Sequence, residues 1–82
     1  MLDSAITMYE NKDYENALTM LDKIISKNPK NPYAYYYKGA IFEQTGKLDN
    51  ALIEYKTSIS KDPNFSLSYY MIAVVSDTTA II

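Results

Sequence analysis

An internal repeat with a period of 34 residues most constrains how this 82-residue chain can fold. The segment ISKNP at 25–29 returns as ISKDP at 59–63, and ENAL at 15–18 returns as DNAL at 49–52. The same offset aligns three small residues, Ala5, Gly39 and Ala73. Because the match continues along the chain, it indicates copies of one structural unit.

Each copy has the hydrophobic pattern of helices. Apolar residues recur at helical spacing from Tyr14 to Ile25, and the stretch from Leu48 to Ile59 repeats that stripe. Pro29 and Pro63 follow the stripes, where proline stops a helix. The pattern predicts helices and no strand, with helices at about 2–11, 14–27, 32–45, 48–61 and 66–80.

The turns between paired helices are short. Gly46 is expected to take the left-handed conformation that ends a helix. Asn11-Lys12 fills the same place in the first copy, and Asn11 is the residue better suited to that conformation.

A helix pair repeated every 34 residues is the period of the tetratricopeptide repeat, and residues 32–65 resemble that family closely. Lys38 departs from its pattern, because leucine is commoner there. Residues 1–31 match from partway into the first helix, and 66–82 begin a third copy. The matching positions in the second copy hold Tyr35, Gly39, Phe42, Ala51, Tyr55 and Pro63.

The resemblance implies an all-α fold, a right-handed α-solenoid of antiparallel helix pairs with about two and a half repeats. It implies a single domain over residues 1–82, with repeat one at 1–31, repeat two at 32–65 and a partial repeat three at 66–82. Small residues are expected to let neighbouring helices approach. The stacked pairs are expected to form a concave face.

Composition argues against catalysis. The chain has no Cys, His or Arg, so it lacks a thiolate nucleophile, the usual general base near neutral pH and a bidentate anion clamp. Its two glycines form no phosphate-binding loop. We expect no catalytic residue, no cofactor and no metal site. A net charge of −2 without Arg argues against nucleic acid, including an RNA-binding helical repeat.

A membrane partner is not expected either, because the apolar C-terminal stretch is shorter than a bilayer span. The N-terminal stretch lacks the basic start and apolar run of a secretory signal. The sequence therefore predicts a cytoplasmic protein.

Nine tyrosines are the unusual feature of the composition. Tyr35, Tyr36 and Tyr37 point in three directions around a helix, and the resemblance places Tyr35 in the core. It also implies that one helix of each pair lines the concave face. The partner-binding residues expected on that face are Leu2, Ile6, Tyr33, Tyr36, Tyr37, Ala40, Glu43, Gln44, Tyr70 and Val74.

The predicted function is a protein–protein interaction scaffold that holds an apolar or aromatic peptide segment, with tyrosines as rigid anchors. In the alternative, the tyrosines only pack, and the chain is a structural or oligomerisation segment of a longer repeat protein. Some family members clamp chaperone C-terminal carboxylates with cationic residues. That use is not expected here, because a carboxylate would lie unpaired against the corresponding residues Leu2, Ile6, Tyr37, Leu67 and Met71.

The last predicted helix has no partner helix in the sequence and is apolar on more than one side. Exposed apolar surface of this kind favours association. Two explanations remain: a fragment of a longer array, which we favour, or a homo-oligomer formed through the C-terminal helix. Some self-association is expected in either case. The residues concerned are Ile72, Val74, Val75, Ile81 and Ile82.

Overall fold

The computed structural model describes residues 2–81, with side chains described through Asp77. Its helices are α1 (Leu2–Glu10), α2 (Tyr14–Lys27), α3 (Pro32–Gln44), α4 (Leu48–Lys61) and α5 (Ser66–Ile81). The predicted all-α class is confirmed over this range, and each helix end agrees with its prediction to within one residue. The side chains of Ile81 and Ile82, predicted to extend the apolar surface, lie outside the described residues.

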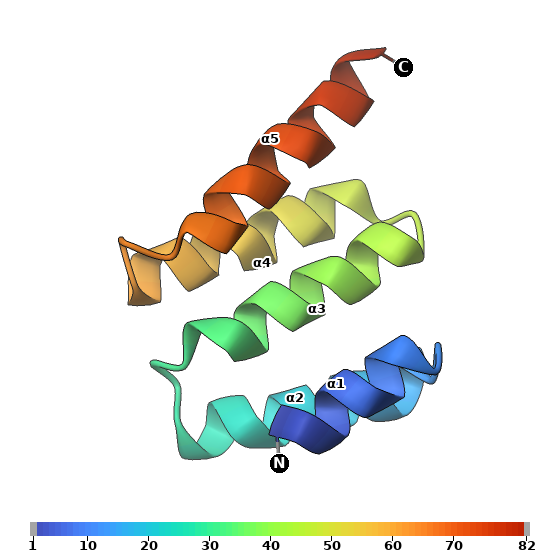
Figure 1. The fold of residues 1–82 in the computed structure, drawn as a ribbon, viewed down its shortest axis with the longest axis vertical. Coiled ribbons are helices and arrows are strands. Elements are labelled where there is room, and N and C mark those ends of the chain that lie inside the picture. The colour runs from blue at the N-terminus through green and yellow to red at the C-terminus, as the bar shows by residue number, and fades with distance from the viewer. Residues whose placement is uncertain (1, 82) are drawn as a thin grey trace.

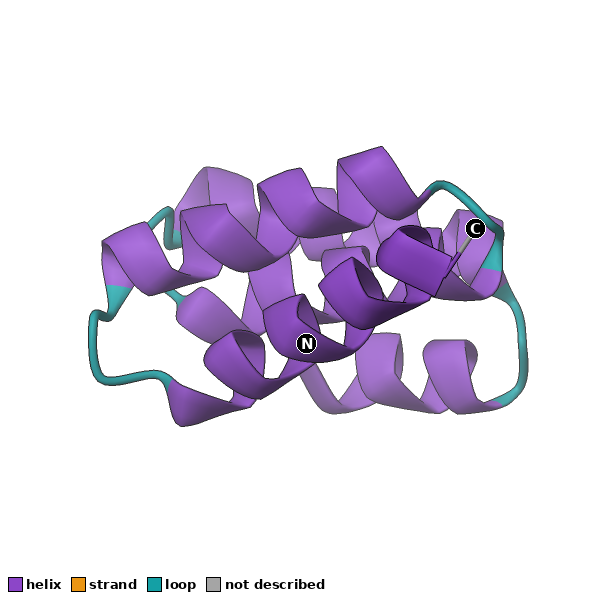
Figure 2. Ribbon diagram, turned by 90° about the horizontal axis from the view of Figure 1, so that it is seen from above, coloured by secondary structure: helices purple, strands orange, loops and turns teal. Residues whose placement is uncertain are grey.

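The helices stack as antiparallel pairs, α1 with α2 and α3 with α4, and α5 continues the stack beyond α4 (Figure 1). Short loops join the helices along the two sides of the stack, where the helices end (Figure 2). Within residues 2–81, α3 contacts every other helix, whereas α5 contacts only α3 and α4. No helix within residues 2–81 combines the length and apolar character that a bilayer crossing needs.

The two turns within pairs are the same structure built from different residues. Lys12 and Gly46, which share one repeat position, both have positive φ, 63° and 82°. Asp13 N–H donates to the Met8 carbonyl, and Lys47 N–H donates to the Phe42 carbonyl, both at 2.8 Å. The expectation that Asn11 would take the left-handed conformation is therefore wrong: the repeat register places Lys12 there.

The core consists of two clusters. Helix α3 contributes to both, because Tyr37 packs against the first cluster and Tyr36 and Phe42 against the second. The first cluster joins α1, α2 and α3 through Ala5, Ala17, Leu21, Ile24, Ala34 and Ile41. The second joins α4 and α5 through Ala51, Tyr55 and Val75.

Gly39 provides the close approach between α3 and α4. A Cβ atom at Gly39 would lie 2.7 Å from Cε1 of Tyr55, whose side chain is fully buried. The expectation that a small residue lets these helices approach is thus confirmed here. Ala73, at the same repeat position on α5, is exposed instead, because no described helix covers that side of α5.

Candidate functional site

A chain of aromatic contacts runs from α1 across α3 to the start of α5. Tyr9 contacts Tyr37 edge-on, with ring centroids 5.9 Å apart, and Tyr37 contacts Tyr36 at 5.1 Å. Phe65, the residue before α5, then contacts Tyr36 at 5.8 Å and Tyr33 at 4.9 Å. Each such pair adds about 0.5–1.5 kcal/mol beyond burial. These five residues, here the tyrosine row, are therefore held in fixed orientations.

The tyrosine row is partly structural and partly accessible. Tyr36 and Tyr37 pack against the two core clusters yet remain partly exposed. Leu2 likewise packs against the first cluster with part of its side chain exposed. The sequence left open whether such tyrosines pack in the fold or face a partner. The rings of Tyr36 and Tyr37 pack against the core and also remain accessible to a partner.

Four large apolar side chains are exposed among the described residues of α3 and α5, and one of them, Tyr69 at 51%, occupies the repeat position of Tyr35. Tyr33 is 44% exposed, Leu67 46% and Tyr70 69%. Sequence reasoning included Tyr33 and Tyr70 among the expected partner-binding residues, but it named Leu67 only as a residue that a bound carboxylate would lie against. The repeat offset would have found it, because Leu67 occupies the position of Tyr33.

The other predicted site residues differ in what they offer a partner. Ile6 and Val74 are partly exposed and Gln44 is exposed. Ala40 is only 6% exposed, so its expected place on the contact surface gives almost no accessible area. Glu43 is partly exposed, and its Oε1 accepts a hydrogen bond from the Tyr55 hydroxyl at 2.9 Å.

Burial raises the pKa of Tyr9, Tyr36 and Tyr37 above the ordinary tyrosine value. The negative charge of Glu43 raises the pKa of Tyr9 and Tyr36 further, and that of Glu10 does so for Tyr37. All three phenols therefore stay neutral in the physiological range and can donate hydrogen bonds. Glu10 and Tyr9 were absent from the predicted site, although the repeat offset maps them onto Gln44 and Glu43.

Tyr35 lies at the edge of the fold. It is half-buried and belongs to neither core cluster, which contradicts its expected core position. Its hydroxyl donates to the Pro29 carbonyl at 2.9 Å, and Lys61 Nζ lies 5.8 Å from its ring centroid. Tyr35 therefore fastens α3 to the preceding loop and to the end of α4.

Lys38, the departure from the family pattern, joins three helices. Its Nζ donates to Oδ1 of Asp22 on α2 at 3.0 Å and lies 3.6 Å from Oε2 of Glu54 on α4. Burial lowers the pKa of Lys38, but the Asp22 hydrogen bond and both carboxylate charges outweigh it and raise the pKa overall. Both carboxylate partners of Lys38 therefore lie on even-numbered helices, α2 and α4.

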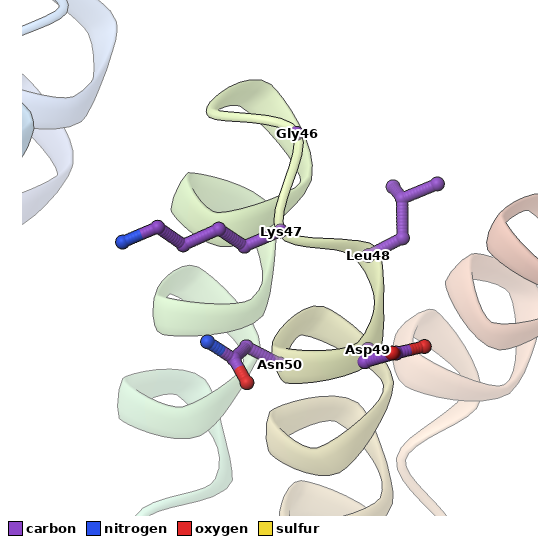
Figure 3. Close-up of a pocket in the computed structure, with 5 residues that line it drawn as sticks. All are labelled: Gly46, Lys47, Leu48, Asp49 and Asn50. Atoms are coloured by element: carbon purple, nitrogen blue, oxygen red, sulfur yellow. The ribbon is translucent and has the colours of Figure 1, made fainter.

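Two hollows lie on the surface of the described residues. One of about 270 Å³ is lined by Gly46, Lys47, Leu48, Asp49 and Asn50, and another of about 370 Å³ lies along α1. In the first, Lys47 and Asn50 point to one side and Leu48 and Asp49 to the other (Figure 3). Among the described residues, no group of three or more His, Cys, Asp or Glu side chains is placed to hold a metal ion.

Comparison with known proteins gives one family. The family model of the tetratricopeptide repeat matches residues 8–73 of this chain. The TPR repeat-containing protein MJ1428 of Methanocaldococcus jannaschii is 36% identical over 59 residues, 72% of this chain and 10% of that protein. The TPR repeat-containing thioredoxin TTL4 of Arabidopsis thaliana is 29% identical over 66 residues, 80% of this chain and 10% of that protein.

A third relative is the auxiliary subunit NAA25 of the N-terminal acetyltransferase B complex of Arabidopsis thaliana. It is 40% identical over 43 residues, 52% of this chain and 4% of the subunit. The chain therefore spans a tenth or less of the length of these relatives.

Proposed function

The chain belongs to the tetratricopeptide repeat family, and on that premise we propose that it is a protein–protein interaction module. A segment of a partner protein would bind across the tyrosine row, on the face of α1, α3 and α5 that the sequence predicts to be concave. The observation that carries this proposal is the row itself. It presents partly exposed rings from two helices in orientations fixed by their neighbours. Rigid aromatic anchors lose little conformational entropy on binding.

Exposed side chains of α3 and α5 support an apolar or aromatic partner segment. Tyr33, which contacts Phe65, and Leu67 and Tyr70 near the start of α5 add accessible apolar area. Tyrosine hydroxyls can also bond to the backbone of a bound peptide. One relative is named as an auxiliary subunit of a complex, which fits a chain that acts by binding other proteins. A cytoplasmic location, as the sequence predicts, is part of this proposal.

The proposal is tested by photo-crosslinking from the surface. A photoreactive amino acid replaces Tyr70 in one protein and Ile53 in another, both expressed in the native cell. Ile53 is the matched control, because it is 59% exposed but lies on α4. Crosslinks from position 70 should map to one partner segment and disappear when Tyr33→Ala is added. Equal crosslinking from both positions would rule out binding on this face.

A second candidate is a structural segment that packs against a further helix. Tyr69 and Ala73 on α5 are exposed, whereas their counterparts Tyr35 and Gly39 lie against the α4 helix. The same face of α5 would then hold a following helix of a longer array or of another copy. Light scattering over a range of concentrations tests the second case. A mass that stays monomeric throughout would exclude association of copies.

A further inference from the structure

The charges of the protein are unevenly distributed between its helices. The three odd-numbered helices carry four carboxylates, Asp3, Glu10, Glu43 and Asp77, and a single lysine, Lys38. That lysine is paired with Asp22 and Glu54 on the even-numbered helices. The lysines other than Lys38 lie on α2, α4 or the connecting segments. The layer that bears the tyrosine row is therefore acidic.

The acidic residues also stand where a helix least favours them. Glu10 is the last residue of α1 and Glu43 is next to last in α3, and neither helix has a basic residue in its last turn. Helices α2 and α4 end with Lys27 and Lys61 instead. A helix C-terminus carries partial negative charge, so a carboxylate there destabilises the helix and a cation stabilises it. Helices α1 and α3 thus lack the basic residue that offsets the partial negative charge at the C-terminal ends of α2 and α4.

These carboxylates adjoin the tyrosine row. Glu10 follows Tyr9 in the chain, and Tyr9 contacts Tyr37 of α3. Glu43 accepts a hydrogen bond from the Tyr55 hydroxyl, and the Tyr55 ring lies 5.8 Å from that of Tyr36. Burial is the main cause of the raised pKa values of Tyr9, Tyr36 and Tyr37, and the charge of Glu43 for Tyr9 and Tyr36, or of Glu10 for Tyr37, adds to it. Aromatic faces and carboxylates both attract cations.

We propose that the partner segment is basic, and that an arginine side chain of it binds at Tyr9 and Tyr37 beside Glu10 and Glu43. A guanidinium group can stack on a tyrosine ring while its N–H groups bond to a carboxylate, so it satisfies both features at once. It would also supply the positive charge that the ends of α1 and α3 lack. This inference rests on the proposed function and specifies the chemistry of its partner.

The test uses three fluorescein-labelled peptides of one length. The first alternates arginine with leucine, and the other two carry glutamine or glutamate in place of every arginine. Fluorescence anisotropy should show the arginine peptide binding the intact protein at least about tenfold more tightly than the glutamine peptide. Its affinity should fall as salt is raised, because salt screens exposed charges. Equal affinity for the arginine and glutamine peptides would overturn the inference.

Paired variants locate the effect. Glu10→Gln with Glu43→Gln should weaken the arginine peptide about tenfold, since it removes both charges yet keeps an acceptor oxygen for Tyr55. Glu15→Gln with Asp49→Asn changes the net charge equally but on α2 and α4, and should leave the affinity unchanged. An equal loss in both pairs would reduce the effect to net charge and overturn the inference. Circular dichroism confirms that each variant is helical.

The proposed function fails separately from this inference. One outcome is that the glutamine or glutamate peptide binds best while the photoreactive residue at position 70 still crosslinks to a partner. In that case the face binds protein, but not through a cation. If the arginine peptide binds and its affinity is insensitive to Glu10→Gln with Glu43→Gln, the cation site proposed here is wrong. If no peptide binds, the inference is overturned, and the crosslinking experiment alone judges the proposed function.

Discussion

Ser58 of α4 and Ser68 of α5 are hydrogen-bonded to each other, and neither side chain is exposed to solvent. Ser58 Oγ also lies 2.6 Å from the carbonyl oxygen of Tyr55, and it satisfies both contacts when Ser68 donates to it. In the preceding repeat the same positions hold Ile24 and Ala34, which belong to the apolar first cluster. Equivalent stacking contacts are thus apolar between the first two repeats and polar between the next two.

This pair gives a double-mutant cycle. Ser58→Ala should lower the free energy of unfolding by about 1–3 kcal/mol, because it leaves the buried Ser68 hydroxyl without that partner. Adding Ser68→Ala should restore part of the loss, since both polar groups are then gone. Urea denaturation of the four proteins measures this. A double variant less stable than either single variant would contradict it.

Gly39→Ala should destabilise the protein despite the better helix propensity of alanine. The new methyl group meets the Tyr55 ring, and overpacking of this kind costs about 1–3 kcal/mol. The first repeat shows a compatible pair, Ala5 with Leu21 at the same positions. The loss of stability in the double variant Gly39→Ala with Tyr55→Leu should therefore be smaller than the sum of the losses in the two single variants. Additive losses in thermal denaturation would show that the two positions are not in contact.

Lys38→Met should cost about 1 kcal/mol, because Glu54 loses its cation at a site where both side chains are only 18% exposed. Asp22, at 64% exposed, should contribute little. Urea unfolding at low and high salt measures the cost, and the difference from the parent protein should shrink as salt is raised. Asp22→Asn is the matched control and should change stability less than Glu54→Gln does.

Stability should fall in alkaline solution. Burial, followed by the hydrogen bond to Glu43, raises the pKa of Tyr55 above its ordinary value of 10.0. A group whose pKa is raised by folding contributes stability that is complete below its unfolded pKa and is lost as pH rises beyond it. Lys38, whose pKa is also raised, acts in the same direction. Urea midpoints should therefore decline above about pH 10, and Tyr55→Phe should decline less steeply.

Tyrosine variants should separate folding from binding. Tyr70→Ala should change stability by no more than about 0.5 kcal/mol, because its side chain is largely exposed. Tyr36→Ala should cost about 2–4 kcal/mol, since its ring contacts Tyr37, Tyr55 and Phe65. Thermal denaturation of both variants checks this. A large loss for Tyr70→Ala would mean that it serves the fold.

The helices and their pairing were predictable from the sequence, because apolar spacing and proline positions report local structure directly. The close approach at Gly39 followed from the aligned small residues, whereas its neighbour Tyr55 was identified only by the structure. Residue type misled at the first turn: asparagine suits a left-handed conformation better than lysine, but the repeat register decided for Lys12. The right-handed twist, the repeat boundaries and the oligomeric state stay predictions.

The candidate site was less predictable, because spacing gives the direction of a side chain and not what lies across from it. The burial of Ala40 depends on the large side chains around it. Lys38 is stabilised by partners on two other helices, and Glu43 by the Tyr55 hydroxyl. Such contacts join residues of different helices, so no single stretch of sequence contains them.

The central place of α3 has a consequence for cooperativity. Since α3 touches all four other helices, its backbone amides should exchange with deuterium only when the whole protein opens. Amides of α5, which rests on α3 and α4 alone, should exchange sooner through partial opening. The proposed binding face includes α3, which opens with the whole protein, and α5, which can open alone. A ligand that bridges Tyr33 and Tyr70 would therefore slow amide exchange in α5, whereas exchange in α3 would still require global unfolding.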